Sequence, residues 1–174
     1  MKMFATTVLA AGALVLTASS VSAQGVNDAQ IASIVVTANQ VDIDAGKLAA
    51  TQARSAEVKA FGKQMATDHA GVNKQAVALV TRLKVTPEDN PTSKSLEQGG
   101  EDNVKNLRSL KGAAFDKAYI DHEVVYHQAV LDAVDKTLIP NAKNEELKAL
   151  LVKVPPAFVA HLEHAKHVQA SLAK

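Results

Sequence analysis

The sequence contains no cysteine and no tryptophan, and aromatic residues make up only 3% of its 174 residues. Without cysteine the chain forms no disulfide, so its stability must come from buried apolar surface or from a bound ligand. It has no cysteine nucleophile, no Gly-x-Ser-x-Gly turn and no phosphate-binding glycine loop. These absences argue against nucleophilic catalysis and favour a protein that is not an enzyme.

An excess of positive charge is also missing. Lys and Arg together number 19, Asp and Glu together number 18, and no run rich in Lys or Arg occurs. Nucleic-acid binding needs clustered positive charge that neutralises phosphates. We therefore do not expect nucleic acid as a partner, whereas the composition leaves a protein partner or a homo-oligomer open.

No segment reaches the roughly 20 consecutive apolar residues that a membrane-spanning helix needs. The longest apolar and small-residue run, Phe4–Ala18, follows Lys2 and precedes Val21-Ser22-Ala23, a small-residue cleavage site. This order is typical of a secretory signal peptide. We expect residues 1–23 to be removed after Ala23. Residues 24–174 should then form one periplasmic or secreted domain that does not span the membrane.

Alanine and valine dominate the rest of the chain, and apolar residues recur at spacings of three and four. This periodicity predicts an all-α protein. Four long helices are expected at about 27–52, 55–84, 113–137 and 156–173. Two shorter ones are expected at about 92–110, where Gly99-Gly100 weakens the middle, and at 145–153. The predicted fold is an up-and-down four-helix bundle with two short extra helices in the connections.

Several metal-ligand side chains fall on the apolar faces of these helices. His69 lies four positions after Met65, and His161 lies three after Phe158, so both are expected to point inward. Glu123 and His127 are four apart and share a face. Imidazole and carboxylate groups suit zinc, iron or copper. The sequence thus predicts a single transition-metal ion bound by groups drawn from Asp42, His69, Glu123, His127 and His161.

Two other interpretations compete with a single-metal site. A carboxylate-bridged di-iron centre requires Glu-x-x-His pairs, and the sequence has none, so ferroxidase chemistry is not expected. The same histidines could instead form a buried hydrogen-bond network in a non-catalytic interaction or envelope-stress protein. The sequence leaves that alternative open.

Three motifs on separate predicted helices resemble those of a bacterial family labelled domain of unknown function 4142. They are Phe61-x3-Met65-x2-Asp68-His69-x3-Asn73, Gly112-x2-Phe115-Asp116-x2-Tyr119-x7-His127 and Pro156-x4-His161-x3-Ala165. The resemblance implies an exported protein with a ferritin-like helical bundle, and it favours His69, His127 and His161 over the other histidines. Asp42 stands where the family pattern leads us to expect Glu. The resemblance implies no activity.

Overall fold

The computed structural model describes residues 25–173, and all regular structure in that range is helical. The long helices are α1 (Asp28–Gln52), α2 (Ala56–Arg82), α3 (Pro91–Ser109), α4 (Gly112–Ala133) and α7 (Pro155–Leu172). A five-residue π-helix, η1 (Val134–Leu138), and the short helices α5 (Ile139–Asn141) and α6 (Glu145–Lys153) connect α4 to α7. The all-α prediction is confirmed for the described residues. The expected signal peptide and its cleavage site lie outside them.

Polar caps fix where the helices begin, because each satisfies backbone N–H groups that lack a partner inside the helix. Asn27 and Gln30 form a capping box before α1, and the side chain of Ser55 caps α2. Asn90 caps α3 together with Ser93. The buried carboxylate of Asp116 on α4 accepts hydrogen bonds from the backbone N–H groups of Arg54 and Ser55, both at 2.8 Å. The α1–α2 turn is thereby bound to α4.

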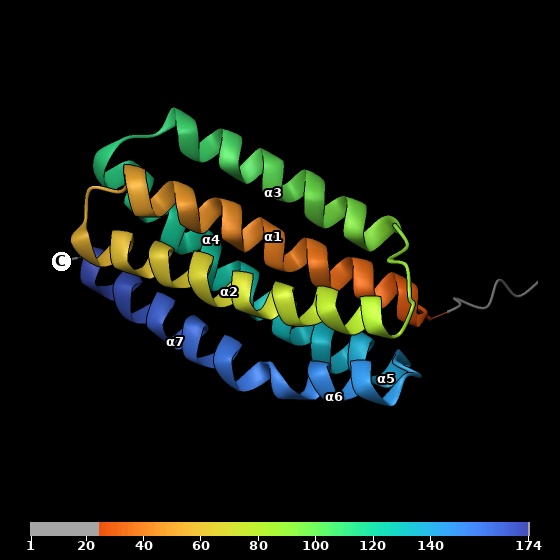
Figure 1. Cartoon of the computed structure of the whole chain (residues 1–174). Helices are drawn as coiled ribbons and strands as arrows, with labels where there is room; N and C mark the ends of the chain where they lie inside the picture. The colour runs from red at the N-terminus through yellow and green to blue at the C-terminus, as the bar shows by residue number, and fades with distance from the viewer. Residues whose placement is uncertain (1–24, 174) are drawn as a thin grey trace, which may run out of the picture.

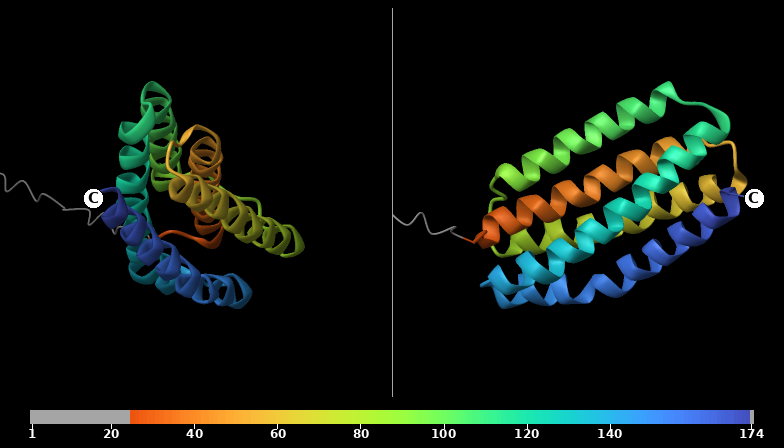
Figure 2. Two further views of the ribbon diagram at one scale, coloured as in Figure 1. Left: turned by 90° about the vertical axis from the view of Figure 1, so that its left-hand side faces the viewer. Right: turned by 180° about the vertical axis from the view of Figure 1, so that it is seen from behind.

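The helices form two antiparallel pairs (Figures 1 and 2). α1 packs mainly against α2, and α4 packs mainly against α7, while α1 also contacts α4 and α2 contacts α7. α3 lies along the outer side of α1. None of the described helices combines the length and apolar character needed to cross a membrane.

The helix expected at about 92–110 is present as α3 with nearly those bounds, but its expected role as a minor helix in a connection is wrong. It has 19 residues, against 18 in α7, and it packs along much of α1. Gly100, which weakened the sequence-based prediction, is buried against α1, and a Cβ added there would lie 2.6 Å from Val41 Cγ2. The glycine therefore lowers helix propensity but permits close packing.

Two of the three apolar core clusters lie toward the ends of the bundle, with buried polar residues between them, and the third contains Leu131, Phe158 and Leu162. One end cluster includes Ala49, Phe61 and Phe115, and the other includes Ile34 and Leu138. On α1, α2 and α4 the residues between these clusters along the chain include the buried groups Asp42, His69, Glu123 and His127. The predicted site residues therefore lie in a layer near the middle of the bundle.

Candidate metal centre

The structure brings all five predicted site residues into one buried layer. Asp42 comes from α1, His69 from α2, Glu123 and His127 from α4, and His161 from α7. Each is at most 4% exposed to solvent. Side chains from four helices therefore meet in one place. The helical periodicity of the sequence predicts only which face of each separate helix they lie on.

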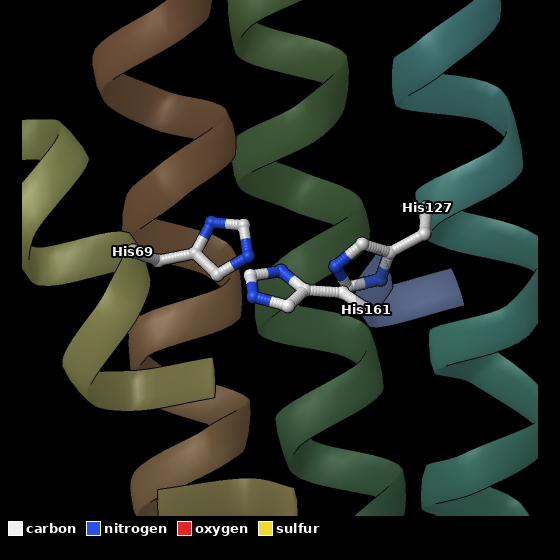
Figure 3. A group of neighbouring side chains, drawn as sticks. All are labelled: His69, His127 and His161. Carbon is white, nitrogen blue, oxygen red and sulfur yellow. The ribbon is translucent and has the colours of Figure 1, made fainter. Parts of the chain in front are cut away.

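The three histidine rings converge, as Figure 3 shows. Their ring centroids lie 5.3 to 5.5 Å apart in every pair. One potential ligand atom from each of His69, His127 and His161 lies within 4.8 Å of the other two. Asp42, Glu123 and His127 form a second such group, so His127 belongs to both.

Each histidine uses one ring nitrogen to bind a neighbouring acceptor. His69 Nδ1 donates to Asn39 Oδ1 at 2.9 Å, and His127 Nδ1 donates to the backbone carbonyl of Glu123 at 3.0 Å. His161 Nε2 donates to Asp68 Oδ2 at 3.0 Å. These bonds set the tautomer of each ring, because the donating nitrogen carries the proton of a neutral imidazole.

The second nitrogen of each ring is left with a free lone pair. His69 Nε2, His127 Nε2 and His161 Nδ1 are buried and have no hydrogen-bond partner among the described residues. Buried polar atoms are normally paired, so three unpaired nitrogens in one layer need an explanation. Histidines that bind metals in proteins show the same division, with one nitrogen on the ion and the other donating to an acceptor behind it.

The two carboxyl groups differ in how they approach the histidines. Asp42 Oδ2 lies 3.4 Å from His69 Nε2, the nitrogen that has no partner. Ligands at about 2.0–2.1 Å from a tetrahedral zinc ion are about 3.3–3.4 Å apart, so this pair has the spacing of two adjacent ligands. Glu123 Oε2 lies 3.4 Å from His127 Nδ1, the nitrogen that already donates to a carbonyl. Asp42 therefore lies next to the unpaired nitrogen of His69, whereas Glu123 lies next to the nitrogen of His127 that is already bonded.

Burial keeps the three histidines neutral. It lowers the pKa of His69 to about 3 and that of His127 to about 4, and it lowers the pKa of His161 as well. The neighbouring rings add to the effect at His69, because a charge on one ring would repel a charge on the next. At neutral pH these nitrogens can therefore donate lone pairs to a metal ion.

Burial has the opposite effect on the carboxyl groups. It raises the pKa of Asp42 to about 7, and the adjacent Glu123 side chain works in the other direction. It raises the pKa of Glu123 well above the usual range, and the nearby charge of Asp42 raises it further. A bound cation would favour the ionised form of both groups.

A small cavity of about 10 Å³ lies next to this layer. Its lining includes Asn39, Asp42, His69, Tyr126 and Phe158. That volume is about what a single water-sized sphere occupies. The ring of Phe158 stacks on His69 with a centroid distance of 5.0 Å and closes one side of the layer.

Two functional neighbours were not identified from the sequence. Asn39 is 3% exposed, and its buried amide on α1 could have marked it as a partner for an inward group. Asp68 directly precedes His69 in the sequence, but its carboxylate accepts from His161 on α7, a pairing that depends on how two distant helices pack.

The remaining histidines belong to neither of the two possible ligand groups. His122 stacks on Tyr126 with a centroid distance of 5.5 Å. His164 Nδ1 is 3.1 Å from Gln64 Oε1, and His167 is exposed. The preference for His69, His127 and His161 therefore agrees with their positions.

A comparison with protein families finds one match. The family model described as "Domain of unknown function (DUF4142)" matches residues 14–168, a range that includes all five residues of the buried layer. Comparisons with the curated proteins and with the solved structures find no match.

Proposed function

We propose that this chain, which belongs to the family described as "Domain of unknown function (DUF4142)", is an exported periplasmic protein that binds one transition-metal ion. The ligands are His69 Nε2, His127 Nε2, His161 Nδ1 and the carboxylate of Asp42. Zinc, iron and copper are the metals whose preferences fit three imidazoles and one carboxylate. Glu123 supports the site by holding His127 through its backbone carbonyl and by lying beside Asp42.

The observation that carries this proposal is the set of three unpaired nitrogens. Each belongs to a buried imidazole whose other nitrogen already donates to an acceptor. Each unpaired buried acceptor costs about 1–3 kcal/mol of stability, and a metal ion would satisfy all three at once.

The alternative, a hydrogen-bond network alone, explains these nitrogens less well. Such a network would use both nitrogens of each ring, with donors and acceptors matched. Here the three histidines bind outward to Asn39, Asp68 and a backbone carbonyl, and leave their inner nitrogens without partners. The exposed surface of the described residues also gives no specific support for a protein-interaction role. The large apolar side chains exposed in the described range are four valines on four different helices: Val77, Val125, Val152 and Val159.

A ferritin-like arrangement forms part of the same proposal. It is supported by the two antiparallel helix pairs and by ligand-type side chains that point into the core from α1, α2, α4 and α7. Bundles of this kind commonly hold metals between facing helices. The likeness is one of shape, and we propose neither iron storage nor ferroxidase activity.

Metal binding can be tested on protein purified without a metal-affinity tag. We expect elemental analysis to find one zinc, iron or copper ion per chain. Adding that metal to metal-free protein should raise the melting temperature, because a ligand that binds only the native state stabilises it by about 2.7 kcal/mol at 100 times its Kd. The absence of a stoichiometric metal together with an unchanged melting temperature would contradict the proposal.

A matched pair of variants tests the assignment of ligands. His127→Ala removes a proposed ligand, whereas His167→Ala removes an exposed histidine from outside the layer. We expect His127→Ala to lose the stoichiometric metal and the shift in melting temperature, and His167→Ala to keep both. Circular dichroism shows whether each variant retains its helices. Equal loss of metal from both folded variants would argue for adventitious surface binding.

A further inference from the structure

A second, larger cavity lies beside the histidine layer and has a different chemical character. Its volume is about 140 Å³, and its walls come from seven helical segments of the bundle. Ile34, Val130, Leu138 and Leu151 are among the apolar residues that line it. Thr92 and Ala129, which also line it, are exposed, so the cavity reaches the surface.

The lining offers a ligand almost no polar partner. The hydroxyl group of Tyr126 donates to the carbonyl of Ala38 at 3.0 Å, and the side chain of Asn39 is bound to His69. No Asp, Glu, Lys, Arg or His side chain lines the cavity. A charged or strongly polar molecule would therefore lose its hydration without compensation.

The size of the cavity limits what it can hold. An apolar cavity of about 150 Å³ lined by Leu, Ile and Phe stays dry and binds benzene or xenon. A cavity of about 140 Å³ with a comparable lining therefore has room for a small ring or a short hydrocarbon. The π-helix η1 contributes Val134 and Leu138 to the lining of this cavity. Such π-helical turns often occur at functional sites.

The apolar cavity and the small cavity of the histidine layer share a wall. Ala38, Asn39, Tyr126, Val130 and Phe158 line both. Phe158 also stacks on His69. A molecule in the larger cavity therefore lies one layer of side chains away from His69 and Asp42.

We propose that this apolar cavity is a binding site for a small uncharged apolar molecule, no larger than about benzene, held next to the histidine layer. Binding in the cavity is independent of any metal. Only the further statement that the molecule lies beside a metal ion rests on the proposed function.

Binding can be mapped with benzene as the probe and metal-free full-length protein. We expect saturable methyl chemical-shift changes in NMR spectra, confined to side chains of the lining such as Ile34, Val130, Leu138 and Leu151. Changes that do not saturate, or that concentrate on exposed Val77 and Val125, would overturn the proposal. This measurement needs no variant, so it does not depend on whether a substituted chain folds.

Two alanine substitutions provide a matched control. Ala133→Leu places extra volume in the cavity, whereas Ala78→Leu adds the same volume at an exposed position on α2. We expect Ala133→Leu to weaken benzene binding at least tenfold, and Ala78→Leu to bind as the unsubstituted protein does. Equal affinity in all three folded proteins would place the ligand elsewhere.

A cobalt experiment separates this proposal from the metal proposal. In protein loaded with Co²⁺, the unpaired electrons should broaden the proton signal of bound benzene. If the chain binds neither cobalt nor zinc, iron or copper, the metal proposal is contradicted while the benzene map in metal-free protein still stands. If cobalt binds and benzene saturates its site without broadening of the benzene proton signal, the inference that benzene lies beside the ion is wrong.

Discussion

Burial acts in opposite directions on the two kinds of titratable group in the histidine layer. It lowers the pKa values of His69, His127 and His161, and it raises those of Asp42 and Glu123. In metal-free protein the histidines therefore resist protonation, while the carboxyl groups tend to hold a proton. The pH dependence of stability follows from these opposed shifts.

The metal-free protein should be most stable near pH 6.5. Below that pH the histidines of the unfolded chain take up protons that the folded chain does not, so stability falls by up to about 1.4 kcal/mol per pH unit for each histidine. The raised pKa of Asp42 acts in the other direction. Above about pH 4 the folded state holds a proton that the unfolded chain has lost, so this contribution to stability falls as the pH rises until Asp42 ionises in the folded state near pH 7. Urea unfolding across pH 5 to 8 measures this curve.

Single substitutions separate the two sides of the curve. His69→Gln should flatten the acidic side, because it removes a group whose pKa drops on folding. Asp42→Asn should flatten the alkaline side. A profile that is flat from pH 8 to pH 5 in the unsubstituted metal-free protein would show that these groups are not perturbed.

At the residue scale, helical periodicity was sufficient to predict that candidate site residues are buried. His69 and His161 follow apolar residues at spacings of three and four, and the structure buries both. Periodicity could not predict partners across helices. The bonds from Asn39 to His69 and from Asp68 to His161 depend on the relative rotation and height of packed helices, which one helix's own spacing does not determine.

At the scale of elements, α1 and α2 approach through glycine. A Cβ added at Gly62 would lie 2.7 Å from Ala49 Cβ and 2.8 Å from the carbonyl oxygen of Gly46. A Cβ added at Gly46 would in turn lie 2.7 Å from the carbonyl oxygen of Gly62. Backbone atoms cannot move aside as flexible side chains do. This contact therefore sets the distance between Asp42 on α1 and His69 on α2.

Gly62→Ala should force these two helices apart. We expect a loss of about 1–3 kcal/mol of stability, because the added methyl group overpacks a close contact. Metal affinity should fall as well, since Asp42 and His69 would separate. Gly71→Ala is the matched control on the same helix, because a Cβ there meets nothing within 4 Å. It should stabilise the protein by about 0.5–1 kcal/mol through its higher helix propensity. Chemical unfolding and metal titration of both variants measure these effects.

The element boundaries show where local sequence signals are strong. The helix starts expected at about 27 and 55 agree with the caps Asn27 and Ser55, because capping depends on neighbouring residues. The end of α4 was predicted less well. The helix expected to reach residue 137 ends at Ala133 and continues as η1, a change of hydrogen-bond pattern without a sequence signature. The role of α3 depended on the close approach at Gly100, which a propensity argument cannot anticipate.

At the scale of the whole molecule, export from the cytoplasm remains a prediction from residues 1–23. Expressed with its own leader in a Gram-negative bacterium, the protein should be recovered from the periplasm with Gln24 as its first residue. Ala23→Arg should block cleavage, because signal peptidase sites require small residues. N-terminal sequencing of the protein in the periplasmic fraction identifies the cleavage site. Full-length protein retained in the cytoplasm would contradict the prediction.

Because the proposed ligands come from four helices, the order of folding also determines when the chain can bind a metal ion. Asp42 lies near the start of the described chain and His161 near its end, so no partly emerged chain contains the complete set. A chain that crosses the membrane unfolded would then collect its ion only after folding on the far side. The metal that it carries would reflect which ions are available in that compartment, more than the order of intrinsic affinities.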